Sequence, residues 1–168
     1  MVFDVIEPHG MFPFAWPKVF MLTNGATGTV EKDCGVVVIL RHNAIPFAMN
    51  NSLRAKYKFG EAFKVNDDAT KAPATQNPFW QRQPMTIPGV GEVKIGIDDL
   101  QASGVMFCVC EVALAVNSAL TAMSLKQDPA ATRKEWLAGL LPGIQPVPSG
   151  VWAVGRAQEH GCAYCYVG

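Results

Sequence analysis

Apolar residues in this chain form short continuous runs that alternate with longer stretches of helical period. The clearest run covers residues 34–40 (CGVVVIL). A continuous β-branched segment of this kind is typical of a strand buried on both faces of a parallel sheet. Similar but shorter runs predict further strands at residues 1–6, 105–109, 144–148 and 162–167. Pro146 and Pro148 place the strand at 144–148 at a sheet edge, because proline cannot donate a hydrogen bond to a neighbouring strand.

Stretches with helical spacing of apolar residues lie between the predicted strands. They cover residues 14–24, 51–58, 98–104, 111–125, 129–141 and 151–160. Residues suited to capping the start of a helix stand at the beginning of several of them: Asn50 or Asn51, Asp98, Asp128 and Ser149. The helix at 111–125 (EVALAVNSALTAMSL) is mostly apolar, so we expect it to pack deeply.

Strands that alternate with helices predict an α/β fold. We expect a three-layer α/β/α sandwich with a mostly parallel five-stranded sheet, in one domain that spans residues 1–168. Residues 66–96 interrupt this pattern with four prolines, little periodicity and the apolar pair Phe79–Trp80. Loops of this length in compact domains are often lids, oligomer contacts or disordered segments. The Phe79–Trp80 pair argues against full disorder. The segment then either forms an ordered contact with another subunit or with a pocket, or it is a loop without a specific role.

The chain carries 14 basic and 14 acidic side chains, so its formal net charge is zero. Nucleic acid is therefore not an expected partner, because phosphate binding needs a surplus of Lys and Arg on one face. A weakly charged, neutral chain favours self-association, and we expect a homo-oligomer. No apolar run reaches the roughly 18 residues that a membrane span needs. The N-terminus lacks the basic and apolar regions of a signal peptide, which indicates a cytoplasmic protein. Because the chain opens directly on a predicted strand (MVFDVI), a periplasmic protein whose export signal was removed is the alternative.

Five cysteines, at positions 34, 108, 110, 162 and 165, are an odd number and do not suggest a disulfide scaffold. Reduced thiols in a cytosol-like compartment are the simpler interpretation. The spacing Cys162-Ala-Tyr-Cys165 is that of a redox motif, but it lies in a predicted strand, where the two side chains face opposite sides. Cys108 and Cys110 are closer together than the usual pairs of zinc ligands, so we expect no metal site.

In a parallel sheet the carboxyl ends of all strands meet at one edge, where ligand sites collect. The residues that the predicted strands bring to this edge are His9, Arg41, His42, Asn43, Cys108, Cys110 and Ser149, with Cys165 and Tyr166 on the last strand. Cys110 is the leading candidate, because it ends a strand and precedes a long helix whose amides would stabilise a thiolate. Glu111 opposes this effect unless its side chain points away. Free cysteines are also among the most buried residues, so a packing role for Cys110 stays open.

Several of the other edge residues have two interpretations. Cys108 lies on the same strand face as Cys110 and is either a resolving thiol or, as we favour, a core residue. His42 is either a base or oxyanion partner or a hydrogen-bonded structural histidine. Ser149 could bind an anion at the start of a helix, although helix capping explains it fully. The candidates for lining a pocket at this edge are Arg41, Asn43, Ser149 and His9.

Three segments of the C-terminal part resemble the DsrE/DsrF-like family of small sulfur-relay proteins. They are residues 100–110 (LQASGVMFCVC), 141–150 (LPGIQPVPSG) and 156–161 (RAQEHG). The resemblance covers residues 98–167 well and 1–65 in outline, and residues 40–48 (LRHNAIPFA) are similar to an uncharacterised subgroup of DsrE-like proteins. The family implies a parallel five-stranded α/β/α domain that forms oligomers and uses no organic cofactor. Three features depart from the family pattern: Cys108, the insertion at 66–96 and the cysteines of the last strand.

In sulfur-relay members of that family a cysteine at the end of the third strand carries sulfur as a persulfide, and Cys110 holds the matching position. The resemblance therefore implies a carrier that exchanges sulfur with donor and acceptor proteins. His42 or Arg41 would support the thiolate, and the segment at 66–96 would cover the site or contact a neighbouring subunit.

Two other hypotheses stay open beside the sulfur relay. One is a non-enzymatic oligomeric module that binds a small ligand or a partner through His42, Asn43 and Ser149, with Cys110 merely buried. The other is a thiol sensor that pairs Cys108 with Cys110.

Overall fold

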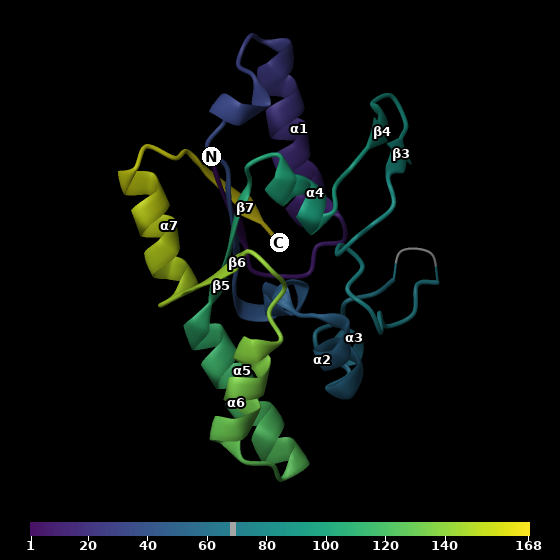
Figure 1. Ribbon diagram of the computed structural model, residues 1–168, viewed down its shortest axis with the longest axis vertical. Coiled ribbons are helices and arrows are strands. Elements are labelled where there is room, and N and C mark those ends of the chain that lie inside the picture. Colours follow the sequence, from purple (N-terminus) through teal and green to yellow (C-terminus); the bar gives the residue numbers. More distant parts are fainter. Residues whose placement is uncertain (68–69) are drawn as a thin grey trace.

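The computed structural model describes residues 1–67 and 70–168 and contains a five-stranded sheet whose neighbouring strands all run parallel. Its strands, in spatial order, are β6 (Ile144–Val147), β5 (Met106–Cys110), β2 (Val37–Leu40), β1 (Val2–Val5) and β7 (Tyr164–Val167). The predicted α/β fold is thus confirmed, and β6 lies at the sheet edge where its prolines place it (Figure 1).

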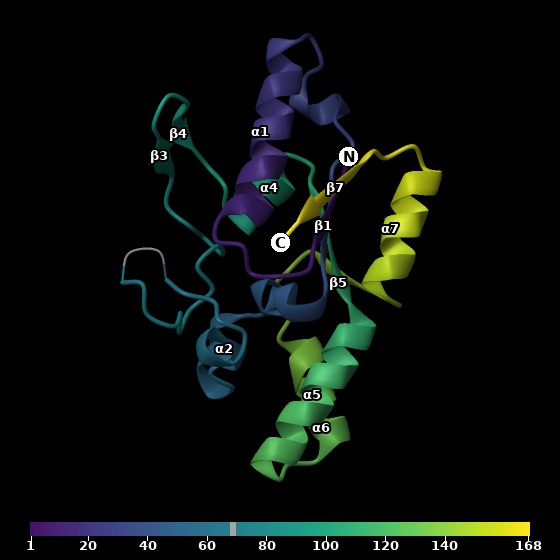
Figure 2. The same cartoon turned by 180° about the vertical axis from the view of Figure 1, so that it is seen from behind.

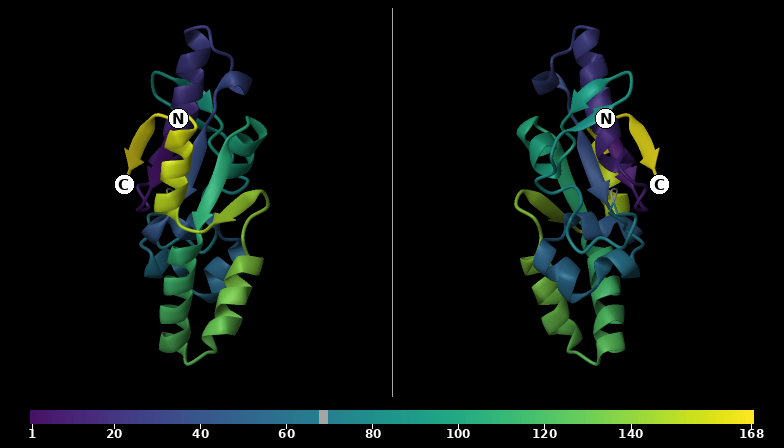
Figure 3. Two further views of the ribbon diagram at one scale, coloured as in Figure 1. Left: turned by 90° about the vertical axis from the view of Figure 1, so that its left-hand side faces the viewer. Right: turned by 90° about the vertical axis from the view of Figure 1, so that its right-hand side faces the viewer.

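Helices flank both faces of this sheet and extend beyond its carboxyl edge (Figures 1 and 2). They are α1 (Phe12–Ala26), α2 (Asn51–Lys56), α3 (Phe59–Ala62), α4 (Ile97–Ala102), α5 (Glu111–Leu125), α6 (Pro129–Ala138), α7 (Gly150–Glu159) and the 3₁₀ helices η1 (Glu31–Asp33) and η2 (His42–Ala48). α7 packs on one face, and α1 and α4 pack on the other. α5 and α6 lie side by side and project past the ends of the strands, as Figure 3 shows. Within the described residues, every helix is too short or too polar to cross a bilayer.

Side chains that alternate along the strands divide the interior into two unequal cores. Phe3, Leu40 and Phe107 face α1 and α4 and belong to the larger core. There, Phe14 stacks on Phe79 with ring centroids 4.2 Å apart. A smaller cluster lies beneath α7 and comprises Val2, Ile39, Cys108 and Ala153. Most of the apolar stabilisation therefore comes from the larger core, and the face beneath α7 is the more thinly covered one.

Three of the predicted helix caps are confirmed. The side chains of Asn50, Asp128 and Ser149 accept hydrogen bonds from the amides of Leu53, Ala131 and Trp152, at 3.0, 2.6 and 3.1 Å respectively. The cap predicted at Asp98 is wrong, because α4 begins one residue earlier, after Gly96. Asp98 Oδ1 instead accepts the amide of Gln81 at 3.0 Å and so ties the insertion to α4.

The expectation that residues 111–125 pack deeply is wrong for much of the helix. The buried residues of α5 are Leu114, Ser118 and Ala122, and its exposed apolar residues include Val112, Val116, Leu120 and Met123. The reason is its position, because α5 passes the end of the sheet and packs on α6 and η2 along one side (Figure 3). An apolar helical sequence predicts burial, but it does not reveal whether the covering element belongs to the same chain.

The segment at 66–96 is described at residues 66–67 and 70–96, and residues 68 and 69 lie outside the described part of the chain. It contains an antiparallel hairpin, β3 (Met85–Ile87) and β4 (Gly91–Val93), which the sequence pattern did not predict. Phe79 is buried in the larger core, so the segment is anchored on the sheet face opposite to α7.

Candidate functional site

A buried ion pair joins β1 and β2 near the carboxyl edge of the sheet. Asp4 is 2% exposed, and its carboxylate accepts hydrogen bonds from Arg41 Nε at 2.6 Å and Arg41 Nη2 at 2.8 Å. The Tyr164 hydroxyl of β7 donates a third bond to Asp4 at 2.9 Å. Bidentate pairing of a guanidinium with a carboxylate is strong and directional. The pair therefore fixes the Arg41 side chain on the face beneath α7.

Arg41 lies against the first residue of α7. A Cβ added to Gly150 would come within 2.6 Å of Arg41 Cδ, so the helix can start this close only because Gly150 has no side chain. The pKa of Arg41 lies above its usual value, mainly because Asp4 hydrogen-bonds to the guanidinium, while partial burial acts in the opposite direction. The Arg41 guanidinium therefore stays protonated, and Asp4 balances its charge. Leu40 of β2 pairs with Val109 of β5, so Arg41 and Cys110, the next residue after each, take neighbouring positions of the sheet.

Cys110 is the last residue of β5 and caps the N-terminus of α5, as its sequence position predicts. Its sulfur accepts a hydrogen bond from the amide of Ala113 at 3.4 Å. An anionic sulfur accepts such a bond more strongly than a thiol does, and the positive end of the helix dipole acts in the same direction. Glu111, whose charge would oppose a thiolate, is paired with Arg133 of α6 at 3.2 Å. The Cys110 side chain is 6% exposed, so protein covers most of the sulfur.

The other four cysteines lie in less favourable surroundings for sulfur chemistry. Cys108 is buried in the small cluster beneath α7, and this burial raises the pKa of its thiol and favours the neutral form. Cys165 lies in β7, and burial raises its pKa as well. Cys34 follows η1 before β2 begins, and Cys162 follows α7. All five cysteines are unpaired.

His42 and Asn43 follow β2, but their partner is Glu7 and not Cys110. Asn43 Nδ2 lies 3.0 Å from both carboxylate oxygens of Glu7, and His42 Nε2 lies 3.6 Å from Glu7 Oε1. His42 has a left-handed backbone conformation (φ 51°), which is uncommon for a residue other than glycine, and its side chain is largely exposed. This left-handed turn separates His42 and Asn43 from Arg41, which stays on the face beneath α7.

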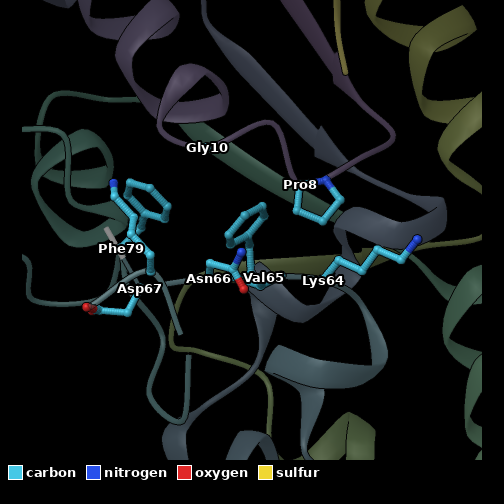
Figure 4. Close-up of a pocket in the computed structure, with 9 residues that line it drawn as sticks. Pro8, Gly10, Lys64, Val65, Asn66, Asp67 and Phe79 are labelled. Atoms are coloured by element: carbon cyan, nitrogen blue, oxygen red, sulfur yellow. The ribbon is translucent and has the colours of Figure 1, made fainter. Parts of the chain in front are cut away.

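Two cavities open beside Pro8 and Lys64, near the carboxyl end of β1. In the first, of about 190 Å³, Pro8 and Lys64 lie on one side and Phe79 and Asp67 on the other (Figure 4). The second, of about 370 Å³, is lined by Glu7, Asn43, Phe63 and Lys64 among others. Cys110 lines neither of them. The cavities and the cysteine are therefore separate features of the same edge.

The structure brings two of the predicted site residues together, Arg41 and Cys110, with Ser149 beside them at the start of α7. Asn43 lines the larger cavity with Glu7, and His9 packs its ring on Phe12, with centroids 5.2 Å apart. The described residues of the segment at 66–96 pack on the opposite face, away from Cys110. Within the described residues, no three His, Cys, Asp or Glu side chains are arranged as metal ligands.

Sequence reasoning missed three residues of this site: Asp4, Tyr164 and Gly150. Asp4 carried a signal, because an acidic residue inside a short apolar strand needs a polar partner when the strand is buried. Tyr164 and Gly150 carried none, since their roles depend on elements that are adjacent in space and distant in sequence.

The fold and this edge define an α/β protein with a parallel five-stranded sheet, in which a helix-capping cysteine lies beside a buried Asp–Arg pair. No family model matches the chain, and no curated protein matches it. Among solved structures, the protein of unknown function MTH1491 from Methanobacterium thermoautotrophicum is similar, with a TM-score of 0.50 and 16% sequence identity. The similarity covers 99% of this chain and 96% of that one. At this identity it supports the fold alone.

Proposed function

We propose that this protein is a sulfur carrier of the DsrE/DsrF-like kind, which holds sulfur as a persulfide on Cys110. The observation that carries the proposal is the position of Cys110, whose sulfur accepts the Ala113 amide at the N-terminus of α5 and which ends β5 where Arg41 follows the paired strand β2. A helix N-terminus and a guanidinium both favour negative charge on sulfur. The resemblance of residues 100–110 to that family points to the same cysteine.

The loading step is an attack of the Cys110 thiolate on the outer sulfur of a donor persulfide, R–S–SH. The bond between the donor's two sulfur atoms breaks, a new sulfur–sulfur bond forms at Cys110, and the donor leaves as a thiolate. In the unloading step, an acceptor thiolate attacks the outer sulfur on Cys110, which returns to a thiolate. Electrons balance in both steps, so the transfer needs no oxidant, reductant, metal or organic cofactor.

Arg41 is the charged group that this chemistry would use, and Asp4 and Tyr164 are positioning residues that hold it. The Ala113 amide stabilises the sulfur anion on the other side. Burial raises the pKa of the Cys108 thiol and keeps it neutral, so we do not expect it to act as a second carrier, and His42 is engaged with Glu7.

A binding module without sulfur chemistry is the second candidate, and the burial of Cys110 favours it. At 6% exposure the sulfur presents little surface to a donor. The 370 Å³ cavity lined by Glu7, Asn43 and Lys64 is separate from the cysteine and is within the usual size range of small-ligand sites. In this interpretation Cys110 is a packing residue that also caps α5.

Alkylation kinetics of the folded protein at neutral pH separate these two functions. For a sulfur carrier, we expect iodoacetamide to modify Cys110 at least about tenfold faster than Cys108, whose thiol is kept neutral by burial. Peptide mapping after a short exposure identifies the modified residue. Equally slow modification of both cysteines would favour the binding module.

We further propose that the chain forms a homo-oligomer through an apolar face beside Cys110. This apolar face consists of Val112, Val116, Leu120 and Met123 of α5 and Val151 and Trp152 of α7, each at least half exposed. The first turns of the two helices lie next to each other (Figures 1 and 3). Large exposed apolar patches mark interaction sites, and the zero net charge of the chain lets two copies meet with little repulsion.

Replacing Leu120 with glutamate is expected to dissociate this oligomer, because an unpaired carboxylate would be buried at the contact. We expect the dissociation constant measured by analytical ultracentrifugation to rise about 100-fold. Val90→Glu is the matched control, since Val90 is equally exposed but lies between β3 and β4, outside the apolar face. A native protein that is monomeric at micromolar concentration, or a Leu120→Glu variant with native mass, would contradict the proposal.

A further inference from the structure

The surroundings of Cys110 limit the size of the molecule that can deliver sulfur to it. Cys110 lies between Val147, its register partner on β6, and Arg41, which follows β2 at the neighbouring position. Cys108 belongs to the cluster beneath α7 and Val147 packs against it, and Cys110 faces the same way because it lies two residues after Cys108. The start of α7 lies against Arg41 at Gly150. These neighbours leave Cys110 6% exposed.

A persulfide on a donor protein meets such a sulfur only when the two backbones come close together. The Cα atoms of two disulfide-linked cysteines are about 5.5–6 Å apart, and the sulfur in transit adds about 2 Å, so the backbones must approach to within about 8 Å. A folded donor brings the neighbours of its own cysteine to the same place. At Cys110 that place is occupied by β6, Arg41 and the first turns of α5 and α7. A donor without a polypeptide around its sulfur avoids this obstruction.

Arg41 offers a small donor one open hydrogen-bond donor. Asp4 accepts from Nε and Nη2 of the guanidinium. Among the described residues Arg41 Nη1 has no acceptor, and the side chain is 26% exposed, so a ligand can reach this nitrogen. An N–H group of an ionised guanidinium bonds an anionic acceptor more strongly than a neutral one. Although Asp4 balances the overall charge, Arg41 therefore favours a donor whose leaving sulfur is anionic.

We propose that the sulfur donor is a small inorganic polysulfide and not a persulfide on another protein, an inference that rests on the proposed role of Cys110 as a sulfur carrier. The Cys110 thiolate attacks the outer sulfur of hydrotetrasulfide, HS₄⁻. The adjacent sulfur–sulfur bond breaks, trisulfide (S₃²⁻) leaves with the bonding electron pair, and Cys110 becomes Cys–S–SH. Arg41 Nη1 donates to the leaving sulfur. Atoms, electrons and charge balance in this step.

A comparison of two donors on the native protein tests the proposal. Sodium tetrasulfide is the small donor and persulfidated serum albumin is the protein donor. Mass spectrometry with peptide mapping gives the rate at which Cys110 gains sulfur from each, and glutathione, an unhindered thiol, gives the intrinsic reactivity of each donor. Relative to glutathione, we expect tetrasulfide to load Cys110 at least about tenfold faster than the albumin persulfide does.

Val147→Ala tests the steric argument, because it removes two methyl groups beside Cys110. We expect it to raise loading from the albumin persulfide about threefold and to change loading from tetrasulfide less. Val37→Ala is the matched control and should change neither rate. Val37 is also half-buried and packs on the cluster beneath α7, but it pairs with Met106 at the opposite end of β5.

The outcomes separate the donor from the carrier role. Equal relative rates from the two donors, or faster loading from albumin, would overturn the inference and leave Cys110 as a sulfur carrier. Failure of both donors to load Cys110 would overturn the carrier role, and the inference with it. If Val147→Ala does not fold, the donor comparison on the native protein decides.

Discussion

Cys110→Ser is expected to reduce persulfide loading of this protein to background while the fold stays intact. A serine hydroxyl can still accept the Ala113 amide, so the start of α5 keeps its cap. The hydroxyl is not ionised at neutral pH and cannot attack a donor persulfide. The measurement is sulfane sulfur bound per chain after incubation with a persulfide donor, with circular dichroism to confirm folding.

Cys108→Ala is the matched control for this result. Cys108 lies two residues earlier on the same strand and is equally buried, but the helix amides do not reach its sulfur. We expect this variant to load sulfur at the native level. Loading that survives in Cys110→Ser would remove Cys110 from its assigned role. Loss of loading in both single variants would indicate that the two thiols act as a pair.

Asp4→Ala is expected to lower the free energy of unfolding by about 3 kcal/mol. The substitution leaves the Arg41 guanidinium without its counter-charge and the Tyr164 hydroxyl without its acceptor. The Arg41 side chain is 26% exposed, so water compensates part of the loss and the effect lies at the low end for a broken buried pair. Differential scanning calorimetry should show a melting temperature lower by about 6–12 °C for a chain of this size.

Tyr164→Phe is the control that separates the ion pair from the rest of the cluster. It removes one hydrogen bond from Asp4 and leaves the bidentate pair in place, so we expect a loss of about 1 kcal/mol. Asp4→Ala should also slow persulfide loading more than Tyr164→Phe, because Arg41 loses its fixed position. A change below about 0.5 kcal/mol in Asp4→Ala would show that the pair does not stabilise the fold.

The strands and helices that local sequence patterns specify are the part of the fold that could be predicted. The continuous β-branched run at 34–40 predicts the central strand, and prolines at 146 and 148 predict an edge. The caps at Asn50, Asp128 and Ser149 were predictable for the same reason, because each bonds an amide three residues away. The strand-to-helix position of Cys110 is likewise a local feature.

Contacts between distant positions could not be predicted from such patterns. Asp4 binds Arg41 and Tyr164, which are 37 and 160 positions away, and it does so only because β1 lies between β2 and β7. The exposure of α5 also depends on the whole fold, since its apolar sequence is compatible with burial or with a partner. The burial of Arg54, in α2, also gave no signal, because a lone arginine in a helix is ordinarily exposed.

The claim that Cys110 carries sulfur in the folded protein is tested most directly by intact mass spectrometry. The native protein is exposed to a persulfide donor and measured with and without reductant. The proposal predicts a gain of sulfur that reductant removes and that peptide mapping assigns to Cys110. No gain of sulfur, with Cys110 inert to alkylation until the protein is unfolded, would contradict it and favour the binding module.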